Sequence, residues 1–382
     1  MRVELTEEQE MIRAMAREFA DKEIRPIAAD IDRGARFPQE TVRRMGALGL
    51  LGMTIPPVWG GSGADAVSYA VAVEEIAKAC ASHAVVMSVN TSLFCEPVHK
   101  HGTEEQKKRF LVPFASGARI GCFALTEPQA GSDATNQATL AVRDGDHYVV
   151  NGRKLFVTNG REAAAALVFC QTDRTTGHHG ISALLIEKGT PGFGVPRVED
   201  KLGLRASDTA EFVFEDCRVP VGNRLAGEGM GFKIAMGALD GGRIGIAAQA
   251  VGIAAGAWEL ALAYARERKS FGVPIGQHQM VQWMLADMAT AIDAARLLTL
   301  KAAWLKDAGQ PFGTTAAMAK LFASETAMKV ATDAVQVHGG YGYITDYPVE
   351  RYFRDAKITQ IYEGTSQIQK LVIARAILGG KA

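Results

Sequence analysis

The chemically most suggestive part of the sequence is a short interruption in its otherwise helical last third. Glu363 stands between Tyr362 and Gly364, in a run flanked by Ile361 and Ile368. A carboxylate in apolar surroundings loses solvation, so its pKa rises towards a value that suits a general base. The local sequence fits a solvated glutamate at a helix end as well, and both interpretations stay open at this point.

Two runs in the middle of the chain combine aromatic, hydroxyl and glycine residues that could hold a ligand. The run 123–133 (FALTEPQAGSD) predicts a strand end that enters a loop, which exposes backbone N–H groups and hydroxyls. In the run 156–160 (FVTNG), Phe156 and Thr158 are two residues apart on a predicted strand and share a face, where the ring could stack on a flat ligand. Taken alone, an ordinary turn and a core Phe beside a satisfied Thr explain these runs too.

Two runs in the last third place positive charges and glycines at helix ends. Arg266, Arg268 and Lys269 stand at the end of a long predicted helix, where the helix dipole stabilises cations and where they could instead face a pyrophosphate. The run 336–342 (QVHGGYG) interrupts a helical region with glycines. Such an interruption is unfavourable unless the backbone must approach something closely, so this run is a candidate ligand contact.

Several common motifs are absent, which narrows the class of protein. The sequence contains no P-loop and no GxSxG, and the glycine-rich run 227–231 has no apolar strand before it, so a Rossmann site is not expected. His178 and His179 lie in a polar loop without a third ligand at useful spacing, so no metal site is expected. Basic and acidic residues number 42 each, which gives no electrostatic case for nucleic acid or an anionic membrane.

Composition and cysteine usage indicate a large core in a reducing compartment. The 382 residues are 48% hydrophobic and 22% charged, enough for two or three packed units. Five scattered cysteines without CxxC spacing indicate neither disulfides nor zinc. The acidic N-terminus (MRVELTEE) lacks the apolar stretch of a signal peptide, and the Ala-rich run 245–258 is too short for a membrane span, which needs roughly 20 apolar residues. We therefore expect a cytoplasmic protein.

The predicted elements run from helices through a β unit to helices again. Thr6 and Gln9 form a capping-box pattern at the first helix, Pro26 ends or bends that helix, and Asp65 can cap a third one. Between about 121 and 221, short runs of period two favour a compact antiparallel sheet or barrel, with turns predicted at 144–145 and 151–152. A helical bundle follows, with helices predicted over 232–268, 279–307, 315–337 and 348–378. The predicted domains are 1–120, 121–230 and 231–382.

Taken together and in this order, these runs resemble the acyl-CoA dehydrogenase family, and most closely its short-chain (butyryl-CoA) branch. The resemblance covers essentially the whole chain, and its most specific pieces are the runs 125–128 and 131–133, Arg268 with 271–272, Gln336 with 339–340, and the run 361–369. It implies an α+β multidomain fold with an N-terminal helical domain, a middle antiparallel β-barrel and a C-terminal four-helix bundle. It also implies a homotetramer, built as a dimer of dimers, with FAD near a dimer interface.

The resemblance further implies site residues. FAD contacts are expected from Phe123, Leu125, Thr126, Gly131, Ser132, Phe156, Thr158, Thr365 and Gln367 and, from a neighbouring subunit, from Arg268, Phe271, Gln279, Gln336, Gly339 and Gly340. Substrate contacts are expected from Ser132, Asp240, Arg243 and Gly364; Asp240 and Arg243 share a helix face. Glu363 would remove the C2 proton of an acyl-CoA while a hydride leaves C3 for FAD, and an electron-transferring flavoprotein would take the electrons.

Comparison with the family pattern also bears on the base and the acyl chain. Some relatives carry the base on the long helix, at the position of Gly242 here, which leaves Glu363 as the matching carboxylate. Gln249 and Thr359 resemble the polar closure of short-chain pockets, which favours an acyl chain of about four carbons; one methylene changes binding by only ~1–3 kcal/mol. Gln129 in place of a frequent Gly and Phe156 in place of a frequent Trp are departures from the pattern. Alternatives are a short branched-chain dehydrogenase or an oxidase of the same fold.

Overall fold

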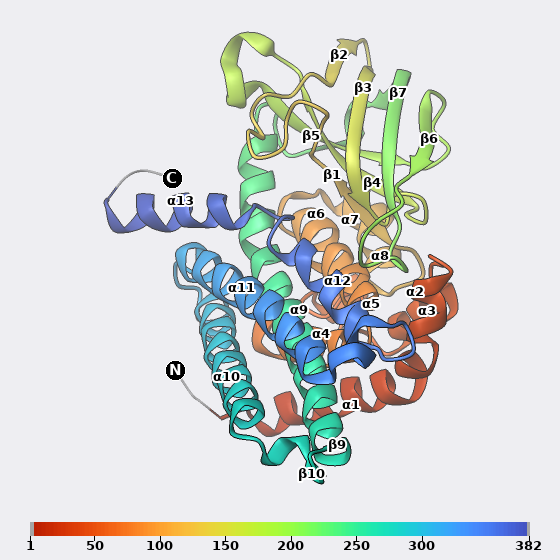
Figure 1. Cartoon of the computed structure of the whole chain (residues 1–382). Helices are drawn as coiled ribbons and strands as arrows, with labels where there is room; N and C mark the ends of the chain where they lie inside the picture. Colours follow the sequence, from red (N-terminus) through yellow and green to blue (C-terminus); the bar gives the residue numbers. More distant parts are fainter. Residues whose placement is uncertain (1–3, 380–382) are drawn as a thin grey trace.

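The computed structural model describes residues 4–379, so the first three residues of the acidic N-terminal stretch lie outside the described part. Helices from both ends of the chain pack together, and the strands form a separate unit at one end of them (Figure 1). The predicted order of helices, sheet and helices is confirmed. Element type changes between Ala115 and Gly121 and between Leu225 and Gly231, next to the domain boundaries at 120/121 and 230/231, which stay predictions.

The chain before residue 121 forms eight described α-helices. The capping box is confirmed, since the Thr6 hydroxyl accepts from the Gln9 N–H at 3.3 Å and the Gln9 side chain accepts from the Thr6 N–H at 2.9 Å. Pro26 bends the chain within a 3₁₀ turn, and Asp65 caps α4 as predicted. The helices are α1 Glu7–Phe19, α2 Ala28–Arg33, α3 Gln39–Ala47, α4 Ala66–Ala79, α5 Ala81–Ser88, α6 Glu96–His101, α7 Glu104–Phe110 and α8 Val112–Ala115, with η1 Ala20–Ile24, η2 Arg25–Ile27, η3 Pro57–Trp59 and η4 Val89–Cys95 between them.

The middle of the chain forms one sheet, hydrogen-bonded in the order β6-β7-β3-β2-β4-β5-β8, with β1 also pairing with β4. The predicted turn at 144–145 is confirmed, because β2 and β3 form a hairpin in which Asp144 pairs with His147. The strands are β1 Gly121–Ala124, β2 Leu140–Asp144, β3 His147–Thr158, β4 Ala165–Gln171, β5 Ile181–Glu187, β6 Phe193–Val198, β7 Thr209–Pro220 and β8 Arg224–Leu225, with η5 Arg174–Gly180 and η6 Val221–Asn223.

One expectation for this sheet is wrong, and a second holds with an exception. The predicted turn at 151–152 is instead an irregularity inside β3, where the Asn151 side chain exchanges hydrogen bonds of 2.8 and 3.1 Å with Asp216 of β7. The expected antiparallel pairing is confirmed for most strand pairs, and the exception is β4, which is parallel to β1 and to the end of β2. The β2–β3 hairpin lies between β1 and β4 in the sequence and gives the connection the length that a parallel pair requires.

The last third forms the predicted helices around a long central one, α9 (Figure 1). Their bounds are α9 Gly231–Glu267, α10 Gln279–Asp307, α11 Gly313–His338, α12 Val349–Thr359 and α13 Ser366–Ile377, with β9 Lys269–Ser270, β10 Val273–Pro274, η7 Ile275–Gln277 and η8 Gly339–Tyr343. By length and composition α9 could cross a membrane, so the length argument drawn from 245–258 does not hold for the whole helix. However, 72% of its most apolar window is buried, as in the core helix of a bundle.

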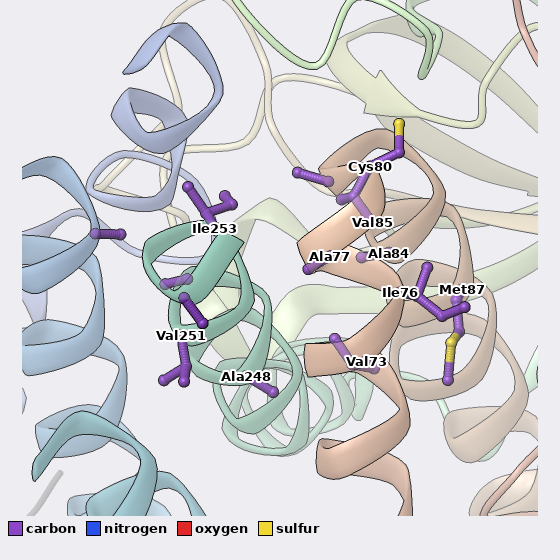
Figure 2. Close-up of a cluster of buried hydrophobic side chains, with 14 of the residues drawn as sticks. Val73, Ile76, Ala77, Cys80, Ala84, Val85, Met87, Ala248, Val251 and Ile253 are labelled. Atoms are coloured by element: carbon purple, nitrogen blue, oxygen red, sulfur yellow. The ribbon is translucent and has the colours of Figure 1, made fainter. Parts of the chain in front are cut away.

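The main core lies where α9 meets α4 and α5 (Figure 2). Val73 and Ile76 of α4 and Val85 of α5 are at most 5% exposed, as is Val251 of α9. Small residues such as Ala248 lie between them, so the helix backbones approach closely. This packing holds α9 in place, and Gly242 and Arg243 lie within two turns of Ala248 on the same helix.

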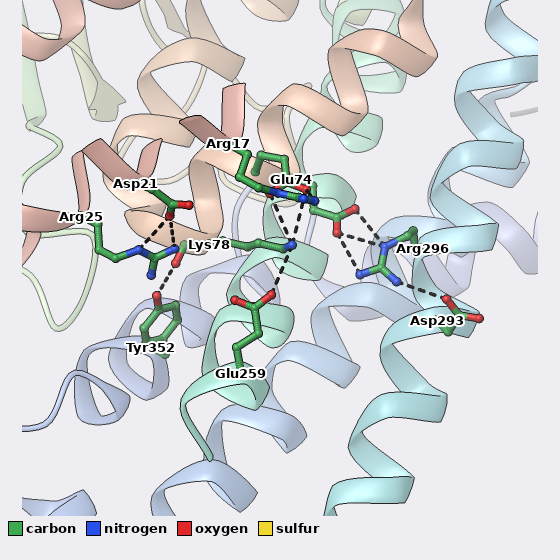
Figure 3. Close-up of polar contacts among 10 residues, drawn as sticks. Arg17, Asp21, Arg25, Glu74, Lys78, Glu259, Asp293, Arg296 and Tyr352 are labelled. Atoms are coloured by element: carbon green, nitrogen blue, oxygen red, sulfur yellow. Dashed lines mark hydrogen bonds and ion pairs between the residues drawn. The ribbon is translucent and has the colours of Figure 1, made fainter. Parts of the chain in front are cut away.

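Charged residues on the same stretch of α4 join the N-terminal and C-terminal helices (Figure 3). Glu74 of α4 pairs with Arg296 of α10, with the closest N–O distance 2.9 Å, and the neighbouring Glu75 pairs with Arg17 of α1 at 2.9 Å. Lys78 lies between Glu75 and Glu259 of α9, 3.4 Å from each. These ion pairs connect four helices and fix α4 and α9 relative to one another.

Candidate active site

Glu363 lies in the turn between α12 and α13, with a backbone φ of +51°. Both carboxylate oxygens are buried and lack a hydrogen-bond partner among residues 4–379. Burial raises the pKa of Glu363 to about 7, and the positive charges of Lys320 and Arg243 only partly offset this effect. The solvated-glutamate interpretation therefore does not hold, and the side chain has the environment of a general base.

The carboxylate occupies space that only a glycine at position 242 leaves free. A Cβ atom on Gly242 would lie 2.1 Å from Glu363 Oε2 and 3.0 Å from Leu93 Cδ2. A side chain at position 242 and the Glu363 carboxylate would therefore occupy one location. A side chain on α9 and the Glu363 carboxylate exclude each other here.

Next along α9, Asp240 and Arg243 form an ion pair of 2.5 Å, as their shared helix face implies. Burial raises the pKa of Asp240, and Arg243 partly counteracts the change. Arg243 is only 7% exposed, and its Nε–H has no hydrogen-bond partner among the described residues. This part of α9 therefore presents an unsatisfied donor within electrostatic reach of Glu363, as an anionic or polar ligand would require.

Gln249 and Thr359, the predicted closure of an acyl pocket, are both fully buried. Gln249 is held in place because it accepts a hydrogen bond from the Tyr362 hydroxyl and donates one to the Ala81 carbonyl at 2.8 Å. The Thr359 hydroxyl donates to the Ala356 carbonyl at 2.7 Å. Tyr362, the residue next to Glu363, is thus tied to Gln249 of α9, and this contact fixes the position of both side chains.

The structure brings together the two runs predicted to meet a flavin on the sheet. The Leu155 N–H donates to the Thr126 carbonyl at 2.8 Å, so β3 follows the segment that contains Leu125 and Thr126. Phe156 has φ of +56° at a bulge in β3, which leaves its ring 63% exposed while Val157 is buried. Thr158 is half-buried, and Phe123, Gly131 and Ser132 belong to the same region at the end of β1.

A buried ion pair that the sequence analysis did not single out supports this region. Lys154 and Glu127 are 0% and 1% exposed, and Lys154 Nζ lies 2.7 Å from Glu127 Oε1. Lys154 also donates to the Leu125 carbonyl at 3.1 Å. Gln129, a departure from the family pattern, donates to Glu127 at 2.7 Å and so reinforces the loop. No local signal identified Lys154, since strand alternation places it on the same predicted face as Phe156 and Thr158.

We expect Lys154→Met to loosen this loop and to weaken FAD binding. Removing one partner leaves the Glu127 carboxylate buried and uncompensated, which typically costs about 3–5 kcal/mol of folding free energy. Urea unfolding and the flavin absorbance of the purified variant measure the two effects. The control is Arg218→Met, since Arg218 and Asp144 form an ion pair that is 52% and 62% exposed and is worth at most about 1 kcal/mol. Equal effects of the two variants would contradict the assignment.

The remaining predicted FAD contacts lie elsewhere. Arg268, Gly339 and Gly340 line a hollow of about 470 Å³ together with Tyr264 and His338. It lies beyond the C-terminal end of α9, whereas the sheet adjoins the other end (Figure 1). A helix of 37 residues is about 55 Å long, so one chain does not bring the two groups together. Phe271 (95% exposed), Gln279 and Gln336 do not line this hollow but are close in the chain to residues that do, while Thr365 caps α13 and Gln367 is exposed on it.

One segment connects the Glu363 region with the sheet. The π-helix η4 contacts both α9 and β1. Leu93 of η4 lies against Gly242, and the ring of Phe94 lies against Gly121 at the start of β1. Glu363 and the strands predicted to face a flavin are therefore on either side of one buried π-helix. Within the described residues, no group of His, Cys, Asp or Glu could hold a metal ion.

Comparisons with known proteins identify the family. Profiles described as the N-terminal, middle and C-terminal domains of acyl-CoA dehydrogenase match residues 6–118, 122–217 and 229–378. The chain is 56% identical to the short-chain specific acyl-CoA dehydrogenase of Clostridium acetobutylicum, over 98% of each chain.

Two solved structures agree with this assignment. Butyryl-CoA dehydrogenase from Megasphaera elsdenii is 46% identical, with a TM-score of 0.97 over 99% of this chain and 100% of that one. A chain of a structure described as the electron transferring flavoprotein of Acidaminococcus fermentans is 52% identical, with a TM-score of 0.98 over 99% and 100%. This protein is therefore an oxidoreductase that belongs to the acyl-CoA dehydrogenase family.

Proposed function

We propose that this chain is an FAD-dependent dehydrogenase that oxidises a short-chain saturated acyl-CoA to the trans-2-enoyl-CoA. The observation that carries the proposal is the buried Glu363 carboxylate, which has no hydrogen-bond partner among the described residues and lies against Gly242 beside Arg243. Because no described residue donates to this carboxylate, a bound ligand is the group from which it could accept a proton. The names of the short-chain and butyryl-CoA relatives support an acyl-CoA as that ligand.

In the proposed mechanism, Glu363 removes the proton from C2 of the acyl group. The Gly364 N–H donates to the thioester carbonyl oxygen and stabilises the negative charge that develops there. Asp240, Arg243 and Ser132 bind the polar parts of coenzyme A. Bound FAD, which Phe156 and Thr158 would hold, would supply the acceptor for the hydride that leaves C3 as the C2–C3 double bond forms.

Several features of the chain fit a bound flavin. The Phe156 ring is exposed on the sheet, although its backbone is held at a positive φ by the bulge. Ser132 and Gly131 are exposed beside it, and the buried Lys154–Glu127 pair holds their loop. We propose that Phe156 and Thr158 meet the isoalloxazine ring and that Phe123, Leu125, Thr126, Gly131 and Ser132 surround it. Thr365 and Gln367 are proposed as further FAD contacts.

The absorbance of the flavin tests the proposal directly. Purified protein is expected to be yellow and to bleach anaerobically when butyryl-CoA is added. A protein that stays colourless when given FAD would overturn the proposal. Bleaching rates across straight and branched acyl-CoA chains test the size of the acyl group, for which the buried Gln249 and Thr359 favour about four carbons. Fastest bleaching by isobutyryl-CoA or 2-methylbutyryl-CoA would favour the branched-chain alternative. Formation of peroxide at the full turnover rate in air would favour an oxidase.

The raised pKa of Glu363 sets the expected pH dependence. Only the ionised carboxylate removes a proton, so kcat/KM is expected to rise with pH and to level off above about 7, the pKa of the free enzyme's base. An unperturbed glutamate would give an acid limb near 4.5 instead. A pH profile of kcat/KM for butyryl-CoA measures the limb, and one centred near 4.5 would remove the desolvated base from the mechanism.

We also propose that the active enzyme is a homotetramer in which FAD is shared between subunits. The proposed FAD contacts on the sheet, around Phe156, are separated from the hollow at Arg268. This separation supports the proposal, because the two groups can meet on one cofactor only across subunits. Helix α13 projects from the body of the protein (Figure 1), and its Leu371 and Ile377 are 51% and 70% exposed. Light scattering is expected to give about 164 kDa, four times 40.9 kDa. A monomer that holds FAD and turns over would contradict this assembly.

The proposed electron acceptor is an electron-transferring flavoprotein, in line with the description of one structural relative. A cytoplasmic location, with no membrane or nucleic-acid partner, completes the proposal. All five cysteines are free and buried, as a reducing compartment allows. Steady-state reduction of an added electron-transferring flavoprotein by butyryl-CoA and this enzyme tests the acceptor.

A further inference from the structure

The turn that carries Glu363 is conformationally strained, and two buried side chains, Gln369 and Lys320, donate hydrogen bonds to its backbone. Glu363 and Gly364 both have positive φ angles, +51° and +90°. Such angles are unfavourable for a glutamate and persist only where the surroundings impose them. Gln369, fully buried on α13, donates through Nε2 to the Glu363 carbonyl at 3.2 Å and to the Gly364 carbonyl at 2.9 Å. Lys320, fully buried on α11, donates to the Gly364 carbonyl at 2.7 Å.

These contacts determine the direction of the Gly364 N–H. In a trans peptide the C=O and N–H bonds point in opposite directions, and the structure holds no cis peptide bond among its described residues. Since the Glu363 carbonyl points towards Gln369, the N–H of the same peptide, that of Gly364, points away from Gln369. It donates to no acceptor among residues 4–379. A Cβ atom on Gly364 would lie 2.6 Å from Gln369 Nε2, so the contact also depends on glycine at this position.

We propose that Lys320 and Gln369 are positioning residues for the reaction. Gln369 orients the Gly364 N–H towards the thioester carbonyl, and Lys320 holds the next peptide and keeps a positive charge beside the base. Neither side chain touches the reacting atoms. The proposal rests on the proposed function, since it assigns roles in that same proton transfer.

The charges around the base indicate what Lys320 contributes. Lys320 from α11 and Arg243 from α9 are the positive groups that act on Glu363, and both lower its pKa. Burial is the main cause that raises the pKa of Tyr69 on α4 and of Tyr362 in the turn, and the charge of Glu363 acts in the same direction, so both tyrosines are neutral groups near the base. Glu325, one turn along α11, is tied to Ser366 and Gln360 at 2.8 Å each. Removing Lys320 therefore removes one of the two positive charges beside the base.

Two variants separate the two roles. Lys320→Met is expected to move the acid limb of kcat/KM for butyryl-CoA to higher pH, and a shift of one unit would lower the rate about tenfold at pH values below the limb. Gln369→Met keeps every charge, so it is expected to lower kcat about tenfold or more with an unmoved limb. It is also expected to weaken binding of acetoacetyl-CoA, whose enolate resembles the transition state, more than binding of crotonyl-CoA.

Controls distinguish positioning from loss of folding and from failure of the proposed function. Lys320→Arg keeps the charge and is expected to restore the limb of the natural enzyme. Lys78→Met removes a lysine of the Figure 3 cluster, 12% exposed and remote from Glu363, and is expected to leave the limb unmoved. An unmoved limb in a folded, FAD-containing Lys320→Met would overturn the role of Lys320, and equal losses for both ligands in Gln369→Met would overturn that of Gln369. If the unaltered enzyme does not bleach with butyryl-CoA, the proposed function fails instead.

Discussion

Glu363→Gln is expected to abolish turnover while FAD binding is retained. The amide cannot accept the C2 proton, and loss of a general base typically lowers the rate by ~10²–10⁴-fold. The amide matches the carboxylate in size, so the turn and the contacts of Lys320 with the Gly364 carbonyl are kept. Anaerobic bleaching by butyryl-CoA and exchange of the C2 proton with deuterated water measure the loss. Turnover at the natural rate would remove Glu363 from its role.

The same variant is expected to be at least as stable as the natural protein at pH 8. The pKa of Glu363 is raised from 4.5 to about 7 in the folded state, so the folded protein binds the proton more tightly than the unfolded chain does. Stability linked to this group is therefore present at low pH and is lost as pH rises from about 4.5 to about 7. At pH 8 the buried charge destabilises the fold, and the glutamine removes it. Thermal unfolding at pH 5 and pH 8 checks the sign, and a variant clearly less stable at pH 8 would contradict it.

Gly242→Ala is expected to have the second-largest effect on activity, although it adds a single methyl group. The new Cβ would lie 2.1 Å from Glu363 Oε2, so the carboxylate must move. Misplacing a catalytic group by about 1 Å can lower the rate by about 10²-fold. We expect FAD content to be unchanged, because the atoms nearest to this position belong to Glu363 and Leu93 and not to the sheet residues around Phe156. Bleaching rates at saturating butyryl-CoA measure the loss.

A matched control lies on the same helix. Gly237 of α9 is exposed, and a Cβ there would meet nothing within 4 Å. Gly237→Ala is therefore expected to keep full activity and to gain about 0.5–1 kcal/mol of stability from the better helix former. If Gly242→Ala behaved in the same way, the carboxylate would not be held where the structure has it.

Local features of the structure follow closely from the sequence. The capping box at Thr6, the cap at Asp65 and the hairpin after Asp144 each depend on residues within a few positions of one another. The turn predicted at 151–152 is wrong because tertiary pairing overrides local preference. Asn151 forms its hydrogen bonds with Asp216 of β7, a residue that local sequence cannot connect to it.

The buried lysines show the same limit at the candidate site. Lys154 and Lys320 read as ordinary charged residues within a strand and a helix. Each is fully buried because a partner distant in the chain compensates its charge or its hydrogen bonds: Glu127 for Lys154 and the Gly364 carbonyl for Lys320. The positions of such partners depend on how the elements pack. Only the folded chain identifies these residues as supports of the loop 127–139 and of the turn that carries Glu363.

Glu363 illustrates the division between sequence and structure most directly. The sequence alone determined the order of the elements, the interruption near Glu363 and the family resemblance, because these are carried by residue types and short spacings. Tertiary structure alone decided that the carboxylate is buried without a partner, that it fills the space above Gly242, and that Gln369 and Lys320 hold its turn. These contacts join α9, α11 and α13 with the turn across gaps of up to 121 positions in the chain, the separation of Gly242 and Glu363. Packing of helices around α9, and not any local pattern, brings them together.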